Sequence, residues 1–214
     1  MVSPLLAITR IENDHCGSNA YVVATANSRS AVVIDPADVN SHRICKQLAI
    51  SGYTKLLVVL THEHFDHMSG VRTLRAVFGA KVVASRECSQ RISDPRKNLS
   101  RYSIGIDIDC EPADMVCEEI GPNLVWEDLH LEFVPAPGHS VGSICIGIDR
   151  NLFTGDTIVP GLPTIVKLPG GDRHTLQSTV MSLLGRFPQD TVLYPGHGIP
   201  CRLGDIDALD VLGK

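Results

Sequence analysis

Apolar residues in this chain fall into short runs that alternate with stretches of helical spacing. The early runs are rich in β-branched residues and are bounded by Gly, Asn, Ser or Pro, which predicts strands joined by tight turns. These runs are LLAITR (5–10), AYVVATA (20–26) and SRSAVVIDP (28–36). The run LLVVL (56–60) is apolar at every position, as expected for a strand that is buried on both faces.

Three other segments have apolar residues at the spacing of a helix. Residues 38–50 and 70–78 each place their apolar side chains on one helical face, and Gly79 is the expected stop of the second segment. Residues 174–187 carry the clearest apolar stripe, with Asp172 as the expected N-cap. Strands and helices therefore alternate over much of the chain.

The pattern is interrupted by residues 93–122, which show little periodicity, and the strands then resume. One more strand is predicted at 81–84, before the interruption, and the strands after it are 129–137, 143–149, 151–156 and 191–198. The interruption carries cations first and acids afterwards, which indicates either a solvated loop or a lid that brings cations to an anionic substrate. The order of elements predicts an α+β fold with two sheets packed face to face and helices outside. No linker divides the chain, so we expect one domain over residues 1–214.

Composition excludes several classes of protein. With 214 residues, 43% hydrophobic and 20% charged, the chain is typical of a globular protein with an ample core. The net charge of −5 and the 5% aromatic content argue against a nucleic-acid partner. No run approaches the ~18 apolar residues of a membrane span. The N-terminal segment lacks the pattern of a signal peptide, and the seven cysteines form no C-x-x-C pair, so we expect reduced thiols and a cytoplasmic location.

The motif THEHFDH follows the buried strand 56–60 directly. It places His62, His64, Asp66 and His67 within six residues. Core packing does not require so many such side chains in one turn, whereas imidazole and carboxylate are strong ligands for zinc, iron and manganese. Strand alternation cannot place all four on one face, so we expect a loop that curls around the metal.

Three more ligand-type residues recur in one local context, a strand followed by a glycine-containing turn. They are His139 after FVPAPG, Asp156 after NLFTG and His197 after VLYPG. Glycine in such a turn lets the backbone approach a metal closely. The combined set exceeds what one tetrahedral ion needs and fits two ions that share a bridging carboxylate. The remaining histidines (His15, His42, His130 and His174) lack this context, and we expect surface or capping roles for them.

These motifs resemble those of the metallo-β-lactamase superfamily of hydrolases. THEHFDH, GHS, GDT and GHG occur in the family's order, and the resemblance covers nearly the whole chain. The most similar subgroup is that of short, single-domain glyoxalase II-like (hydroxyacylglutathione hydrolase-like) proteins. The resemblance implies an αββα sandwich with a dinuclear site at one edge of the two sheets.

Carried over position by position, the resemblance implies a role for each ligand. It places His62, His64 and His139 on the first ion, Asp66, His67 and His197 on the second, and Asp156 between them. Two divalent ions, Zn²⁺ with iron or manganese as alternatives, would share a bridging hydroxide as the nucleophile, and Asp66 would be the catalytic acceptor of its hydrogen bond. Asp35 and Thr61 are expected to orient ligands, although a turn-forming Asp before Pro36 and a strand-ending Thr explain them equally well.

The chain departs from full-length glyoxalase II in two ways. Only about seventeen residues follow His197, where that enzyme carries a helical domain, and no Lys- and Tyr-containing glutathione-binding stretch follows GDT. Recognition is therefore expected from nearby loops, chiefly residues 91–101 and 158–172, without a deep apolar slot for a long acyl chain. The cations that these loops offer to a small anionic substrate are Arg96, Lys97, Arg101, Lys167 and Arg173.

Hydrolysis of a small thioester such as S-lactoylglutathione, or of a related ester, is the function that these features favour. A lactonase shares the expected fold and site. A mononuclear-iron persulfide dioxygenase shares the fold as well, but the G-R-T-D-F stretch usual in that family is absent after Asp156. From a different class, a non-catalytic metal-binding protein would be expected to have an incomplete ligand set, and this set is complete.

Overall fold

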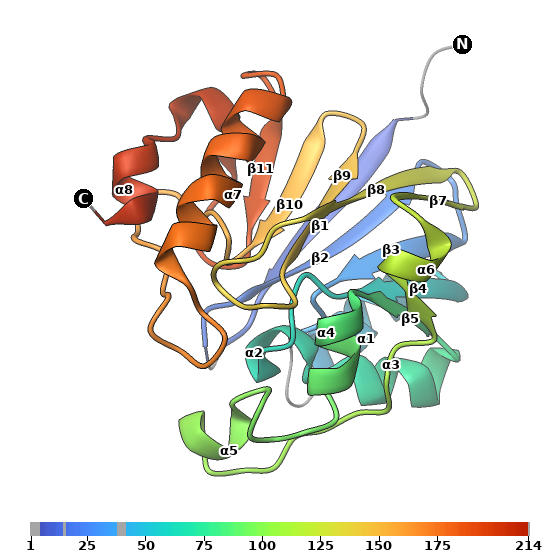
Figure 1. The fold of residues 1–214 in the computed structure, drawn as a ribbon. Helices are drawn as coiled ribbons and strands as arrows, with labels where there is room; N and C mark the ends of the chain where they lie inside the picture. The colour runs from blue at the N-terminus through green and yellow to red at the C-terminus, as the bar shows by residue number, and fades with distance from the viewer. Residues whose placement is uncertain (1–4, 15, 38–41, 214) are drawn as a thin grey trace.

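The computed structural model describes residues 5–14, 16–37 and 42–213. Within them the chain forms two six-stranded sheets (Figure 1). The first sheet contains, in spatial order, β1 (Leu6–Glu12), β2 (Asn19–Thr25), β3 (Ser30–Ile34), β4 (Lys55–Val59), β5 (Lys81–Ala84) and β6 (Met115–Val116). The second contains β12 (Cys201–Arg202), β11 (Val192–Pro195), β10 (Asn151–Gly155), β9 (Ile144–Ile148), β8 (Leu129–Pro135) and β7 (Asn123–Trp126).

Helices connect or follow the strands of both sheets. They are α1 (His42–Ser51), α2 (Phe65–Met68), α3 (Val71–Phe78), α4 (Arg86–Arg91), α5 (Ser100–Ser103), α6 (Cys117–Ile120), α7 (Arg173–Arg186) and α8 (Ala208–Leu212), with a 3₁₀ turn at Leu203–Asp205. The outer faces of the sheets are covered by α1, α3, α4, α7 and α8. Figure 1 shows α7 and α8 beside the second sheet and α1, α3 and α4 beside the first. Within the described ranges, no helix has the length and apolar character needed to cross a membrane.

Three apolar clusters build these layers. The inner cluster joins residues of both sheets, among them Tyr21, Leu57, Phe133 and Phe153. A second cluster packs α1, α3 and α4 on the first sheet, and a third packs α7 and α8 on the second. The expected αββα sandwich is confirmed, because each sheet buries one face against the other sheet and one against helices.

Two of the predicted helices end or begin at the residues that the sequence indicated. α3 ends at Gly79, which adopts a left-handed conformation with φ of 62°. α7 begins after Asp172, whose carboxylate accepts a hydrogen bond from the Thr175 backbone N–H at 2.7 Å. The helix predicted over 38–50 is described from His42 onward, and its first four residues lie outside the described residues.

The middle of the chain is more structured than its sequence pattern predicted. The segment 93–122 contains α5, β6 and α6, each only two to four residues long. β7 follows immediately and was also missed. A helix of four residues has little more than one turn, and a strand of two residues has no repeat. Elements this short therefore show no periodicity in the sequence.

Strand direction brings several chain segments to one edge of the sandwich. β3 and β4 are parallel, so both release the chain at the same end of the first sheet. β10 and β11 are parallel, and β8 runs in the same direction because both β8 and β10 are antiparallel to β9. The residues that follow these strands are the ones that the sequence identified as candidate ligands.

Candidate metal centre

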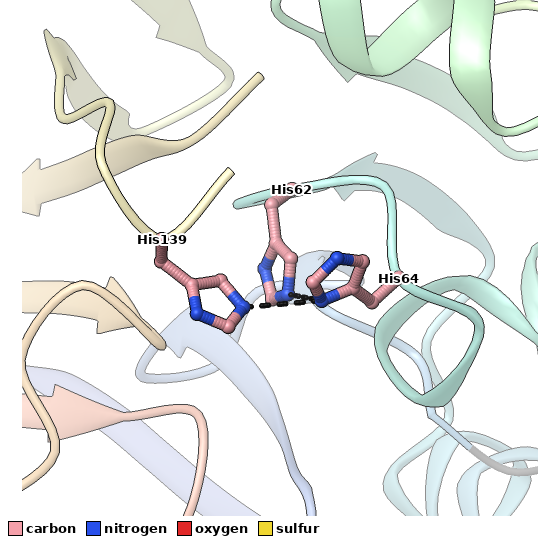
Figure 2. A group of neighbouring side chains, drawn as sticks. All are labelled: His62, His64 and His139. Carbon is pink, nitrogen blue, oxygen red and sulfur yellow. Dashed lines mark hydrogen bonds between the residues drawn. The ribbon is translucent and has the colours of Figure 1, made fainter. Parts of the chain in front are cut away.

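Three histidines from two segments converge at the edge of the sandwich (Figure 2). His62 and His64 lie in the turn after β4, and His139 lies in the turn after β8. The Nδ1 atom of His64 is 3.1 Å from Nε2 of His62 and 3.1 Å from Nε2 of His139. Such close approach of three ring nitrogens fits the tetrahedral ligand sets of zinc and related metals.

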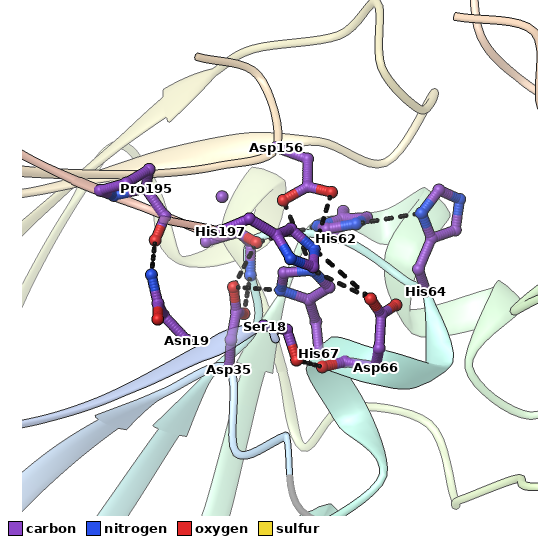
Figure 3. Close-up of polar contacts among 12 residues, drawn as sticks. Ser18, Asn19, Asp35, His62, His64, Asp66, His67, Asp156, Pro195 and His197 are labelled. Atoms are coloured by element: carbon purple, nitrogen blue, oxygen red, sulfur yellow. Dashed lines mark hydrogen bonds and ion pairs between the residues drawn. The ribbon is translucent and has the colours of Figure 1, made fainter. Parts of the chain in front are cut away.

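A second group lies beside the first (Figure 3). Asp66 and His67 come from α2, and His197 comes from the turn after β11. One Asp66 carboxylate oxygen lies 3.5 Å from Nε2 of His197 and 3.8 Å from Nε2 of His67. The ligand atoms of this group lie within 4.8 Å of one another, as in the first group.

Asp156 faces both groups from the turn after β10. Its Oδ2 lies 3.6 Å from Nε2 of His139 and 3.5 Å from Nε2 of His197, while its Oδ1 lies 3.5 Å from Nε2 of His67. A single carboxylate in this position can contribute an oxygen to each group. The structure thus brings together all seven residues that the sequence identified: His62, His64, Asp66, His67, His139, Asp156 and His197.

Two features of the cluster fit bound metal. Nε2 of His67 and Oδ1 of Asp156 are buried and have no hydrogen-bond partner among the described residues, a costly arrangement that metal coordination relieves. Gly196 provides the necessary space, because a Cβ atom there would lie 2.1 Å from Oδ1 of Asp156 and 2.7 Å from Cε1 of His67. Divalent metal is therefore the group that this donor set accommodates.

Burial and neighbouring charges within the cluster strongly shift the pKa values of several of its residues. Burial, together with the adjacent rings, lowers the pKa of His64 to about 3 and that of His62 well below its usual range. Burial also lowers the pKa of His67, but the carboxylates of Asp156, Asp66 and Asp35 outweigh it and raise that pKa to about 10. Burial alone would raise the pKa of Asp66, whereas His67 and His197 lower it well below its usual range. His62 and His64 are thus neutral and ready to bind metal, while His67 holds a proton that a metal ion must displace.

Asp35 lies beneath the cluster and contacts two of its elements. Its carboxylate accepts hydrogen bonds from the Thr61 backbone N–H at 2.7 Å and from the Thr61 hydroxyl at 2.6 Å. The same carboxylate lies 3.1 Å from Nδ1 of His67, which leaves Nε2 of that ring facing Asp66 and Asp156. Asp35 also adopts a positive φ of 48°, a backbone conformation that is uncommon for residues other than glycine.

Sequence reasoning missed two residues at the start of β2. The Ser18 hydroxyl donates to the Asp66 carbonyl at 2.7 Å. Asn19 donates from its backbone N–H to the Gly196 carbonyl at 2.7 Å and from its side chain to the Pro195 carbonyl at 3.0 Å. Together they tie α2 to the turn that carries His197 (Figure 3).

Glu63 was missed as well, although it lies between two candidate ligands. Its side chain is completely buried and contacts Ser140, the residue after His139, instead of the ligand rings. The Ser140 hydroxyl donates to Oε2 of Glu63 at 2.9 Å, and Arg91 lies 3.6 Å from Oε1. Burial raises the pKa of Glu63, and Ser140 and Arg91 counteract this in part. An acidic residue directly between two ligand histidines was the available signal.

Two of the five expected substrate cations already have partners within the protein. Arg101 pairs with Asp107, and Arg173 donates to the Leu212 carbonyl. Arg96, Lys97 and Lys167 are exposed and have no ion pair within the described part of the chain. The Asn98 carbonyl accepts a hydrogen bond from the Phe65 N–H at 2.9 Å, so the segment with Arg96 and Lys97 lies next to α2.

The other histidines stay outside the cluster. His42, His130 and His174 are exposed, and none belongs to a ligand group in the described residues. His15 lies outside the described residues.

Fold and site together define a class of protein. The model of the metallo-β-lactamase superfamily matches residues 13–197, and the chain belongs to this superfamily.

Relatives and a solved structure agree with this assignment. The chain is 30% identical over 183 residues to a probable metallo-hydrolase, YqgX, of Bacillus subtilis (strain 168), covering 85% of each chain. It is 30% identical over 181 residues to the hydroxyacylglutathione hydrolase of Polaromonas sp. (strain JS666), covering 83% of this chain and 60% of that one, so it spans less than two thirds of that relative's length. The crystal structure of BLEG-1 B3 metallo-β-lactamase matches with a TM-score of 0.86 and 27% identity over 93% of this chain and 95% of that chain.

Proposed function

We propose that this protein is a dinuclear metallohydrolase that cleaves a small thioester, or a related ester, of the S-lactoylglutathione kind. One observation carries the proposal: Asp156 lies between two complete ligand groups, at 3.5–3.6 Å from nitrogens of both. A structural metal site would need only one closed group of four ligands. The similarity to a hydroxyacylglutathione hydrolase supports a thioester as the substrate.

The chain's own residues would hold the metals and position the reacting groups. His62, His64 and His139 would hold one ion, Asp66, His67 and His197 the other, and Asp156 would contact both. Zn²⁺ is the ion we favour, with iron and manganese as alternatives. When bound, two such ions supply hydroxide at neutral pH and polarise the scissile carbonyl.

Asp66 has the role closest to the chemistry. Its carboxyl stays ionised because His67 and His197 lower its pKa, so its oxygen can accept a hydrogen bond from the attacking group and orient it. Asp35 fixes the ring of His67, and the Ile165 carbonyl lies 2.8 Å from Nδ1 of His139 and fixes that ring. These contacts keep the ligand rings in place before substrate binds.

The substrate is proposed to be small and anionic. Arg96, Lys97 and Lys167 are its proposed cationic partners, because Arg101 and Arg173 already have partners within the protein. Exposed ion pairs contribute only ~0–1 kcal/mol each, so KM should be weak and should rise with salt. All seven cysteines are free thiols, which supports the proposed cytoplasmic location.

The test is a kinetic panel with metal-loaded protein at low and high salt. It contains a small anionic thioester, an ester, a lactone, a penicillin, structured RNA and, with oxygen uptake as the readout, a glutathione persulfide. We expect thioester hydrolysis with negligible cleavage of RNA or penicillin. Efficient cleavage of the penicillin or of RNA with thioesters untouched would contradict the proposal, and so would oxygen uptake with the persulfide.

A further inference from the structure

A pocket of about 260 Å³ opens directly beside the metal ligands. His139, Asp156 and His197 form one wall. The rest of the lining is a second wall, the segment 159–165, which follows β10 and contributes Val159, Leu162, Pro163, Thr164 and Ile165. A group bound in this pocket would therefore be attached to the atom that reacts at the metals.

The segment 159–165 presents an apolar surface to the pocket. Leu162 is 56% exposed and Ile165 is 58% exposed, although both are large apolar side chains next to a polar cluster. Thr164 does not change this character, because its hydroxyl donates to the Thr157 carbonyl at 3.1 Å. No Lys or Arg is among the described residues that line the pocket.

The wall is held in a fixed position. The Thr164 backbone N–H donates to the Val211 carbonyl at 2.9 Å, which fastens the segment to α8. The Ile165 carbonyl contacts the ring of His139, which fastens it to the metal ligands. The exposed apolar side chains are thus displayed by a segment anchored at both the helix and the cluster.

The expected cations are not among the residues that line the pocket, although Lys167 is only two residues beyond Ile165. Arg96 and Lys97 are carried by the segment that is hydrogen-bonded to α2, whereas the apolar wall faces the ligands His139, Asp156 and His197. The segment that carries Arg96 and Lys97 therefore offers charge near the cluster, whereas the segment 159–165 offers an apolar surface.

We propose that this pocket binds the acyl group of the substrate and selects acyl groups that are short, uncharged and apolar. This inference rests on the proposed hydrolysis, and it assigns any negative charge of the substrate to the leaving group. The volume favours a short group, because pockets for drug-sized ligands begin at about 300 Å³. Leu162 and Ile165 would be the residues that determine specificity.

Binding of the acid products tests the inference without turnover. Acetate, butyrate and hexanoate are titrated into zinc-loaded protein by calorimetry, with succinate as the charged counterpart of butyrate. We expect affinity to rise about two- to fourfold per added methylene, fourfold corresponding to full burial at ~0.8 kcal/mol. Succinate should bind at least about tenfold more weakly than butyrate, because no cation in the pocket offsets the desolvation of its second carboxylate.

Two variants and a matched control locate the effect. Leu162→Ser and Ile165→Ser should each flatten the dependence on chain length while acetate binding is kept. Ile50→Ser alters an isoleucine of α1 that is 71% exposed and lies outside the pocket, and it should leave the dependence unchanged.

Equal affinity across the wild-type series would overturn the inference, as would tighter binding of succinate than of butyrate. Failure here and failure of the proposed function are distinguishable. If esters are hydrolysed but chain length has no effect, the pocket assignment is wrong and the hydrolase stands. If chain length matters but no thioester or ester in the panel is cleaved, the proposed reaction is wrong, and the pocket binds short apolar groups without being the acyl site of that reaction.

Discussion

Gly196→Ala should disable the metal centre through a single methyl group. The new Cβ would lie 2.1 Å from Oδ1 of Asp156, whereas ordinary contacts begin at 3.4 Å, so the carboxylate must move by more than about 1 Å. The backbone cannot retreat, because the Gly196 N–H donates to the Gly155 carbonyl at 2.7 Å and its own carbonyl accepts from the Asn19 N–H at 2.7 Å. Asp156 and the ring of His67 must therefore yield.

The size of the expected losses in rate and metal affinity follows from that displacement. A 1 Å misplacement of a reacting group costs about 10²-fold in rate, and disturbing the support of a metal ligand costs about 10- to 100-fold in metal affinity. Crowding of this kind also lowers the free energy of unfolding by about 1–3 kcal/mol. Metal affinity is measured by chelator competition, activity by thioester hydrolysis, and stability by denaturant unfolding of the metal-free protein.

Gly185→Ala is the matched control. A Cβ atom at Gly185 in α7 meets nothing within 4 Å. Alanine in a helix is more stabilising than glycine by about 0.5–1 kcal/mol. The control should therefore bind metal normally and be slightly more stable. If Gly196→Ala bound metal and turned over substrate like the control, the placement of Asp156 between the two groups would be wrong.

Three further predictions follow from the site. Asp66→Asn should reduce kcat by at least ~10²-fold with the fold retained, whereas Asp190→Asn, at the opposite end of β11, should leave kcat unchanged; equal rates would refute the role of Asp66. Because the pKa of His67 is raised to about 10 in the metal-free protein, metal binding near pH 7 should release about one proton from it, and affinity should rise with pH up to about 10. Calorimetry in buffers of different ionisation enthalpy measures this release, and a pH-independent affinity between pH 6.5 and 9 would contradict it. Glu63→Ala should weaken metal binding about 10- to 100-fold, while Glu63→Gln, which still accepts from Ser140, should retain most of the affinity; identical behaviour of the two would show that this contact does not position His139.

The ligand cluster was predictable because its signal is local in sequence. Each of His139, Asp156 and His197 follows a strand and a glycine turn, and the parallel direction of the strands then brings the turns to one edge. Asn19 could not be found in this way. Its partners are carbonyls of Pro195 and Gly198, and a side chain-to-backbone bond over more than 170 residues leaves no trace in residue type.

The position and apolar character of the pocket wall could not be predicted, for a related reason. Residues 159–165 contain Gly, Pro and isolated apolar residues, which predicts only a loop between Asp156 and the last long helix. Its position depends on hydrogen bonds to Val211 and to His139, which tertiary packing determines. The sequence thus predicted the metal-binding residues and the loop 158–172 as a recognition segment, but not that part of this loop presents an apolar surface to a pocket.

Metal content measured together with activity tests the central claim most directly. Elemental analysis and thioester hydrolysis should be followed on the same sample as metal-free protein is loaded stepwise with Zn²⁺. The two ligand groups joined by Asp156 predict about two ions per chain, with full activity only when both groups are filled, and His64→Ala or His139→Ala should lower occupancy and activity together. A fully active protein that holds one ion per chain would contradict the dinuclear centre.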